Sequence, residues 1–348
     1  MLLEYHIYSG KCNKCGKKAI GVLPEGIGNS WFGCRAHSLM SLLRSKYRQS
    51  TRQVKQFMSD FYGFPISLGS VSHAEERVSE ALIKPHEDVR LSIEKDSLPV
   101  HVDETGFRQN NKTGWAWILA NKKNTYFALN NSRGKKVAKE LLYTILVNGQ
   151  GIAVSDRYAA YNFLPEIKHQ VCWAHLKRDF CKIAERAGSA GKIGRKLLKY
   201  YKLLFGFWKS EGHNRHWTLR RMRKKRSRWI NNLSKWLRLG TTCGHKTTER
   251  TCANILACGK SLWNFLERDD VEPTNNLAER QLRPLVITKK LSFGAFSNRG
   301  ARFIERIFTM IMTCGQQKIE VFQFLCATIR KHHSNTLSYQ AGANLAPT

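Results

Sequence analysis

The chain has 348 residues, with 58 Lys and Arg against 26 Asp and Glu, a formal net charge of +32. So large an excess of positive charge indicates a polyanionic partner, and nucleic acid is the commonest one. The sequence contains no stretch of about 18 apolar residues and no secretory leader, which predicts a cytoplasmic protein without a membrane partner. Its ten scattered cysteines do not predict a disulfide framework.

Residues 1–37 predict a small Gly-rich segment that carries the motif Cys12-Asn-Lys-Cys15. This pair is half of a zinc site, because a structural zinc ion needs four ligands in a tetrahedron. The nearby candidates for the other half have no diagnostic spacing, so a pair without zinc is an equal alternative; these candidates are His6, Cys34 and His37.

Residues 38–95 predict helices. Apolar residues recur at helical spacing between Val54 and Phe61, and Gly63-Phe64-Pro65 ends that helix. A second helix is predicted from about Ser70. Two helices joined by a short turn in a basic chain are compatible with a DNA-binding helix-turn-helix, and equally with a helical hairpin that packs on the core.

Residues 96–173 change to the period of strands. The predicted order is three strands, a helix, a strand, a helix and a strand, with strands at 98–102, 115–120, 125–130, 152–154 and 169–172. This α/β order is that of a ribonuclease H-like domain. Residues 270–332 complete the domain, residues 174–269 form a helical insertion between strand five and the next acidic helix, and residues 333–348 are a tail.

Three acidic residues occupy informative places in this order. Asp103 ends the first strand, Asp156 follows the fourth, and Glu279 is on a short helix. In a ribonuclease H-like fold such carboxylates gather to hold two divalent ions, and their hard oxygen ligands suit Mg²⁺ or Mn²⁺. Each aspartate alone is weak evidence, because many strands end in an aspartate that caps a turn.

The helix that carries Glu279 is predicted to be capped by Thr274 or Asn275 and to end or kink at Pro284. Its polar face suits metal and phosphate together, the alternative being a capping box on the surface. Ala278 and Leu282 are predicted to face the core. We assign four residues of this segment to DNA contact: Asn275, Asn276, Arg280 and Arg283.

The insertion is strongly basic between Arg215 and Arg228. This run suits phosphate contacts, and four of its residues are assigned to DNA: Arg221, Arg223, Lys224 and Lys225. The interleaved tryptophans are predicted to pack in the insertion's own core: Trp208, Trp217, Trp229 and Trp236. At the exit of strand five, His175 and Arg178 are assigned to DNA or the acidic site. Cys172 and His175 are only two metal ligands, which favours packing.

Long motifs resemble the IS66 family of bacterial insertion-sequence transposases. They include Val102-Asp-Glu-Thr-Gly-Phe-Arg, Ser155-Asp-Arg-Tyr-Ala-Ala-Tyr, Cys172-Trp-Ala-His-Leu-Lys-Arg-Asp-Phe and Val271-Glu-Pro-Thr-Asn-Asn-Leu-Ala-Glu-Arg-Gln-Leu-Arg-Pro. The resemblance implies a DDE transposase that cleaves element ends and transfers them to target DNA. Its implied triad is Asp103, Asp156 and Glu279, with two Mg²⁺ or Mn²⁺ ions.

The resemblance also implies terminal inverted repeats and target DNA as partners, a homo-oligomer in the active complex, accessory proteins of the element, and a bacterial cytoplasm close to the nucleoid. Family members usually carry a longer N-terminal region with another Cys pair, so we expect a shortened copy with an incomplete zinc site. Two alternatives stay open: a nuclease of the same fold without strand transfer, and a non-catalytic DNA-binding remnant. The intact carboxylates favour catalysis.

Overall fold

The computed structural model describes residues 6–24, 32–147, 151–209 and 215–343. The chain divides into two compact units, Met1–Pro85 with Lys318–Thr348, and His86–Gln317. The division into five functional segments that the sequence suggests stays a prediction. Within the described ranges, no helix combines the length and the apolar character that a membrane crossing requires.

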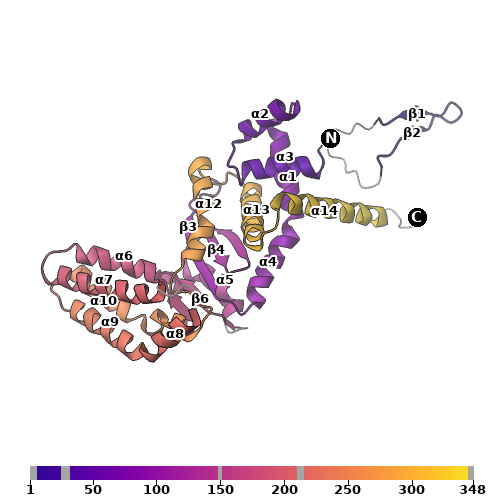
Figure 1. Ribbon diagram of the computed structural model, residues 1–348. Helices are drawn as coiled ribbons and strands as arrows, with labels where there is room; N and C mark the ends of the chain where they lie inside the picture. The colour runs from indigo at the N-terminus through magenta and orange to yellow at the C-terminus, as the bar shows by residue number, and fades with distance from the viewer. Residues whose placement is uncertain (1–5, 25–31, 148–150, 210–214, 344–348) are drawn as a thin grey trace. The chain divides into compact units, whose positions relative to one another are not determined.

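The first unit is a hairpin followed by helices (Figure 1). The hairpin pairs β1 (Ser9–Lys11) with β2 (Lys18–Ile20) in antiparallel register. The helices are α1 (Cys34–Arg44), α2 (Thr51–Tyr62), α3 (Leu68–Ala81) and α14 (Val321–Ala343). Buried residues of α1, α2 and α3 form one core, among them Met40, Val54, Met58, Val71 and Ala74, so the predicted helices are confirmed.

The turn between α2 and α3 has clear local causes. Gly63 adopts a left-handed conformation with φ of 66° and ends α2, as glycine does at many helix C-termini. The Ser67 hydroxyl accepts a hydrogen bond of 3.0 Å from the Ser70 amide and so caps α3. At the other end of α2, Ser50 and Gln53 form a reciprocal capping box.

The second unit is a mixed five-stranded sheet with helices around it, as an α/β architecture requires. The strands are β3 (Val100–Gly106), β4 (Trp115–Ala120), β5 (Thr125–Asn130), β6 (Ala153–Ser155) and β7 (His169–Val171). Their order is β5-β4-β3-β6-β7, with β4 antiparallel to both neighbours and β6 parallel to β3 and β7.

One predicted helix is wrong. Between β6 and β7 the chain forms two 3₁₀ turns, η1 (Ala159–Tyr161) and η2 (Glu166–Lys168), instead of an α-helix. Pro165 stands at the start of the second turn, and the residue before a proline is driven out of the helical region. The helix expected before β6 is present as α5 (Lys135–Val147).

Alternation along β3 separates the two faces of the sheet. Val100 and Val102 are buried with α5 in one hydrophobic core. His101 and Asp103 therefore face the other side, where α12 (Asn276–Ser292) contacts β3. The sequence predicts that Pro284 ends or kinks this helix; an end there is wrong, because the helix continues to Ser292 with Pro284 inside it, and a kink stays a prediction. Other helices of this unit are α4 (Ile83–Lys95) and α11 (Asn264–Glu267).

The free edge of β5 is covered by α13 (Asn298–Gln317). Three side chains spaced four residues apart on this helix accept the amide hydrogens of three alternate strand residues. Four helical residues rise about 6 Å and two strand residues about 6.6 Å, so the two spacings match. The donors and acceptors are Leu129 to Glu305 Oε1 (2.5 Å), Phe127 to Thr309 Oγ1 (3.0 Å) and Thr125 to Thr313 Oγ1 (3.1 Å).

The predicted insertion is a helical bundle (Figure 1), and its hydrophobic core continues into the sheet at Ile152, Val154 and Val171. Its helices are α6 (Trp173–Ala184), α7 (Gly188–Lys209), α8 (Arg215–Lys224), α9 (Arg226–Gly240) and α10 (Lys246–Leu256), followed by η3 (Gly259–Leu262). Trp208, Trp229 and Trp236 pack against this core, which confirms their predicted role. The prediction for the Trp217 side chain falls outside the described residues.

Candidate active site

Three elements bring the predicted carboxylates into one region of the second unit. Asp103 is in β3, opposite Ile118 of β4. Asp156 directly follows β6, which lies parallel to β3. Glu279 is in the first turn of α12, which contacts β3. Parallel neighbours in a sheet present their carboxyl ends at the same edge, which explains why Asp103 and Asp156 approach each other.

The pKa of Asp103 reflects its burial and the proximity of other carboxylates. Burial is the main cause that raises the pKa of Asp103 to about 7, and the negative charges of Glu104, Asp156 and Glu279 raise it further. The Glu104 amide, 2.9 Å from Asp103 Oδ1, opposes the rise. Like charges disfavour ionisation of a carboxyl group, so the shift indicates an acidic cluster that a cation would stabilise.

His175 lies between the other two carboxylates. Its Nδ1 atom is 3.8 Å from Asp156 Oδ2, and its Nε2 atom is 3.2 Å from Glu279 Oε1. Arg178, one turn further along α6, places Nη2 3.6 Å from the same oxygen of Glu279. Sequence reasoning assigned both residues to DNA or to the acidic site, and the structure brings both to Glu279.

Local hydrogen bonds orient Asp156. Its Oδ1 atom accepts the Tyr158 amide at 2.9 Å, which holds the turn after β6. The Ser155 hydroxyl donates to the Asp156 carbonyl at 2.8 Å and lies 2.8 Å from His169 Nε2. The carboxylate therefore leaves the sheet with its second oxygen directed toward His175.

Glu104 is a buried acidic residue that sequence reasoning missed. It points to the opposite face from Asp103, where Arg133 Nε and Nη2 lie 2.8 and 2.7 Å from its Oε1 atom and the Tyr161 hydroxyl donates to Oε2. Burial raises the pKa of Glu104, and these partners oppose the rise. The sequence did carry a signal for Glu104, because it directly follows Asp103 in a buried strand. A buried carboxylate requires polar or charged partners.

Asn275 does not face the surface. It is 2 % exposed, and its Nδ2 atom donates to the Val102 carbonyl at 2.8 Å. It occupies the N-cap position of α12, as predicted, but its side chain makes no capping bond. DNA contact is still a prediction for three exposed residues of the same helix: Asn276, Arg280 and Arg283. Ala278 and Leu282 are buried, which confirms their predicted orientation.

Lys289 is another residue that sequence reasoning missed. Its Nζ atom donates to Thr105 Oγ1 at 2.6 Å and to the Gly106 carbonyl at 2.7 Å. Burial lowers the pKa of Lys289. This contact attaches the later part of α12 to the end of β3. Asn275 makes the corresponding contact at the start of the helix, so polar side chains join α12 to β3 at both ends.

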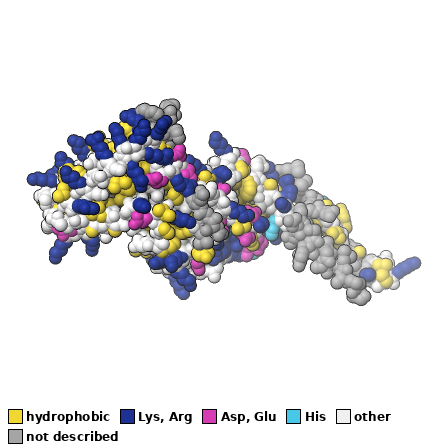
Figure 2. Space-filling view, turned by 90° about the horizontal axis from the view of Figure 1, so that it is seen from below, with side chains coloured by type: hydrophobic (Ala, Val, Ile, Leu, Met, Phe, Trp, Pro, Cys, Tyr) yellow, Lys and Arg dark blue, Asp and Glu magenta, His cyan; other side chains and the backbone are white. Residues whose placement is uncertain are grey.

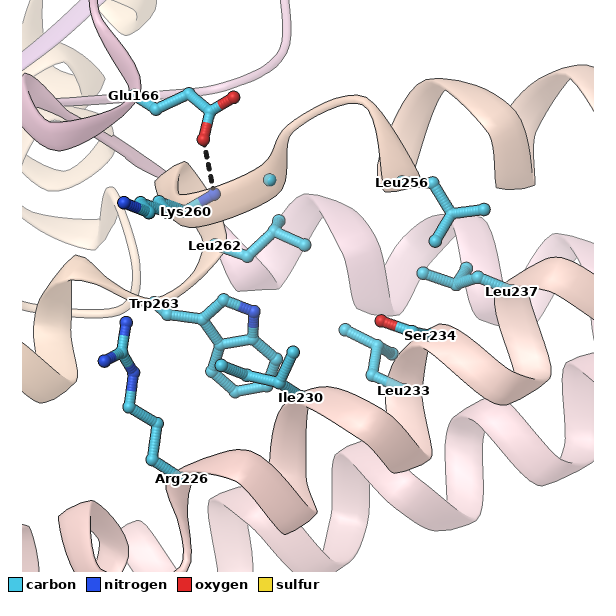
Figure 3. Close-up of a pocket in the computed structure, with 11 residues that line it drawn as sticks. Glu166, Arg226, Ile230, Leu233, Ser234, Leu237, Leu256, Lys260, Leu262 and Trp263 are labelled. Carbon is cyan, nitrogen blue, oxygen red and sulfur yellow. Dashed lines mark hydrogen bonds between the residues drawn. The ribbon is translucent and has the colours of Figure 1, made fainter.

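The basic run of the insertion divides into paired and exposed residues. Arg223 Nη2 is 2.5 Å from Asp269 Oδ1, and the Arg221 guanidinium lies 4.9 Å from the Phe207 ring centre. Lys224 and Lys225 are exposed. Figure 3 shows a nearby pocket with apolar walls from Ile230, Leu233 and Leu256, and with the Glu166 carboxylate accepting the Lys260 amide at its rim. Its lining comes from α9, the end of α10, η3 and Glu166 of η2, and includes none of Asp103, Asp156 and Glu279.

The predicted zinc ligands are on different elements of the first unit. Cys12 and Cys15 are exposed at the turn of the β1–β2 hairpin, whereas Cys34 and His37 belong to α1, where His37 is buried. Across the part of the chain that the structure describes, no group of three or more His, Cys, Asp or Glu side chains is spaced to hold a metal ion. Zinc binding by the Cys pair stays a prediction.

Comparison with known proteins supports the resemblance seen in the motifs. The sequence model of the Transposase IS66 family matches residues 33–303, a range that contains the three carboxylates. The chain is also 24% identical, over 315 residues and 83% of its length, to Uncharacterized protein y4qI of Sinorhizobium fredii. That alignment covers 54% of the relative, so the chain spans about half the length of the curated relative it matches. The predicted family is therefore confirmed: this chain belongs to the IS66 family of transposases.

Proposed function

We propose that this chain is a DNA transposase of an insertion sequence, with a ribonuclease H-like catalytic unit whose acidic triad is Asp103, Asp156 and Glu279. The observation that carries the proposal is that Asp156 and Glu279 both raise the pKa of the buried Asp103, in a member of a transposase family. The strand order β5-β4-β3-β6-β7, with β4 antiparallel to its neighbours, supports the assigned fold.

The chemistry of the donor set fits divalent cations, because carboxylate oxygens are the preferred ligands of Mg²⁺ and Mn²⁺. In the part of the chain that the structure describes, the three carboxylates are not spaced as metal ligands, so binding of the ions would have to draw them together. Burial is the main cause of the raised pKa of Asp103, and a cation would offset the smaller contribution from its negative neighbours. Asp103, Asp156 and Glu279 would hold the ions. When bound, two such ions stabilise the attacking and leaving oxygens of a phosphoryl transfer.

The chain's own residues would orient the reacting groups. His175 and Arg178 contact Glu279 and so restrict its carboxylate to one side of the site. The proposed reaction has two stages. Attack by water on a phosphodiester at the element's end releases a 3′-hydroxyl, and attack by that hydroxyl on target DNA forms the new bond while another 3′-oxygen leaves. The main requirement on the protein is to hold the attacking oxygen, the phosphorus and the leaving oxygen in line.

A row of exposed cations on the insertion supports DNA as the partner. We call it the α7 stripe; it consists of Lys192, Arg195, Lys196, Lys199 and Lys202, all exposed and at helical spacing. Lys177 of the adjacent helix lies 5.9 Å from the Tyr201 ring centre, which joins the stripe to the helix that carries His175. Figure 2 shows many Lys and Arg side chains over this bundle and few acidic ones. Such a surface suits the phosphate backbone.

The first unit supplies a second proposed DNA contact. The α2–α3 pair, with its glycine-containing turn, has the arrangement in which the second helix of a helix-turn-helix enters the major groove. We propose that α3 reads the terminal repeats, and that a homo-oligomer and accessory proteins bring two element ends together. Residues 1–37 would then assist DNA recognition. Cys12 and Cys15 would bind zinc there if further ligands complete the site.

The test is metal-dependent cleavage and joining of DNA that carries the element's ends. Asp103→Asn, Asp156→Asn and Glu279→Gln should each abolish Mg²⁺-dependent cleavage and leave DNA binding largely intact. Glu267→Gln is the matched control, because Glu267 pairs with Arg226, 3.0 Å away in the insertion. A triad variant that cuts at the wild-type rate would remove that residue from the proposal.

The same assay separates the alternatives. Cleavage without joining of the 3′-end to target DNA would identify a nuclease of the same fold. Binding of the repeats by the wild-type protein, without cleavage under any divalent ion, would identify a DNA-binding regulator.

A further inference from the structure

We infer that Asn275 is a positioning residue of the carboxylate site, which joins the three elements that carry Asp103, His175 and Glu279. This inference rests on the proposed function, because it concerns the geometry of the triad. It replaces the surface role that the sequence suggested for Asn275 with a role inside the protein.

The side chain of Asn275 holds β3. Its Nδ2 atom donates to the carbonyl of Val102, the residue before Asp103, at 2.8 Å. Its Oδ1 atom lies 3.1 Å from His101 Nδ1, which donates to it because an amide oxygen only accepts. The two bonds therefore attach Asn275 to the strand on the two residues that precede Asp103. An aspartate in its place would lack the donor, and an alanine would lack both groups.

The backbone of Asn275 holds the other two elements. Its amide hydrogen is donated to Cys172 Sγ, 3.1 Å away, at the N-cap of α6. One residue further on, the Trp173 amide donates to the Pro273 carbonyl at 2.9 Å. The start of α6 is thus bound to the start of α12, and His175 follows within the first turn of α6.

The carbonyl of Asn275 accepts the amide of Glu279 at 3.2 Å, as the first intrahelical bond of α12. Glu279 therefore stands one helical turn from Asn275, and a displacement of Asn275 moves it directly. A residue at the N-cap usually turns its side chain back to the helix, whereas Asn275 turns it into the sheet. The first turn of α12 is in this way set by β3 and not by its own cap.

The chain offers a matched control in Asn264. This residue is also buried, at 6 % exposed, and its Nδ2 atom donates to the carbonyls of Glu166 and His169 at 2.7 and 2.6 Å. Both asparagines join separate segments of the second unit through backbone carbonyls. Among the residues that the structure describes, the Asn264 side chain bonds to Glu166 and His169 and not to β3, the start of α6 or α12, so its loss should cost stability without moving the triad.

The experiment measures Mn²⁺ affinity of the full chain by electron paramagnetic resonance, alongside the unfolding temperature. Asn275→Ala should weaken Mn²⁺ binding by about tenfold or more, the size seen when the partners of metal ligands are removed. Asn264→Ala should lower the unfolding temperature to a similar extent and leave Mn²⁺ affinity unchanged. Equal Mn²⁺ affinity in wild type and Asn275→Ala would overturn the inference.

A gentler pair of variants tests the same link if Asn275→Ala fails to fold. Cys172→Ala removes the acceptor of the Asn275 amide and should weaken Mn²⁺ binding, whereas Cys172→Ser keeps an acceptor and should restore it. Equal affinities in both would overturn the inference. A wild-type protein that binds no Mn²⁺ would instead contradict the proposed triad, and the inference would fall with it.

Discussion

The Nε2 atom of His175 lies 3.2 Å from Oε1 of Glu279, and the two residues are 104 positions apart in the chain. The other ring nitrogen of His175 is 3.8 Å from Asp156 Oδ2. One imidazole from the insertion's first helix therefore contacts two of the three predicted carboxylates. This relationship places the first turn of α6 beside Asp156 and Glu279.

Removing this imidazole should slow the proposed cleavage without preventing DNA binding. His175→Ala is expected to reduce the cleavage rate by about 10- to 100-fold, because residues that orient metal ligands have effects of that size. His245→Ala is the control, since His245 Nδ1 accepts the Thr248 amide at the start of α10 and lies 3.5 Å from Arg186 Nη1, and neither partner is one of the three carboxylates. A His175→Ala protein that cleaves at the wild-type rate would show that the contact with Glu279 is not used.

Neutralising the α7 stripe should reduce the salt dependence of DNA binding. The triple variant Lys192→Gln, Lys199→Gln and Lys202→Gln should lower the slope of log K against log salt by about 2.7 if each lysine contacts one phosphate of duplex DNA. The matched control removes three exposed lysines elsewhere on the second unit: Lys112, Lys122 and Lys123. Equal slopes for the two variants would leave the stripe as an ordinary solvated face.

Mild acid should remove the stability that two buried histidines contribute to the second unit. Burial lowers the pKa of His169 to about 4, and burial with nearby arginines does the same for His86. Each group is neutral when folded and protonates near 6.5 when unfolded, so the unfolded state binds more protons between these values. The contribution of these two histidines is therefore full above about pH 6.5 and falls toward pH 4, by up to about 3 kcal/mol per histidine. The raised pKa of Asp103 acts in the opposite direction, because there the folded state binds the extra proton.

Urea unfolding at pH 7.5 and pH 5 measures this effect. His169→Gln keeps a hydrogen-bonding nitrogen near Ser155 and should reduce the difference between the two pH values. His73→Gln, at an exposed position in the first unit, should not change it. The expectation fails if His169→Gln retains the full wild-type difference.

The helix that covers the sheet edge should be sensitive at Thr309. Thr309→Val leaves the buried Phe127 amide without its acceptor, which should cost about 1–3 kcal/mol of unfolding free energy. Thr288→Val is the matched control, because the buried Thr288 hydroxyl donates only to its own helix, at the Pro284 carbonyl. Equal losses in the two variants would show that the edge contact adds nothing.

Local sequence was sufficient to predict many elements. β4 and β5 begin and end where their alternating residues predict, because the intervening Asn121 side chain accepts the amides of Lys123 and Asn124 and closes the turn. The break at Gly63 and the burial of Trp208 follow equally from local pattern. The helix predicted between β6 and β7 is wrong, although Pro165 is a local residue that opposes a continuous helix there.

The arrangement of the site was decided by contacts between distant segments. The three acids are visible in the sequence, but the inward turn of the Asn275 side chain depends on Val102 and His101, which are 173 and 174 positions away. Helix α12 continues through Pro284, and Thr288 bonds to the carbonyl of that proline within the helix. Periodicity and capping reflect interactions within a few residues, whereas the direction of a buried polar side chain is set by whichever partner the folded chain brings to it.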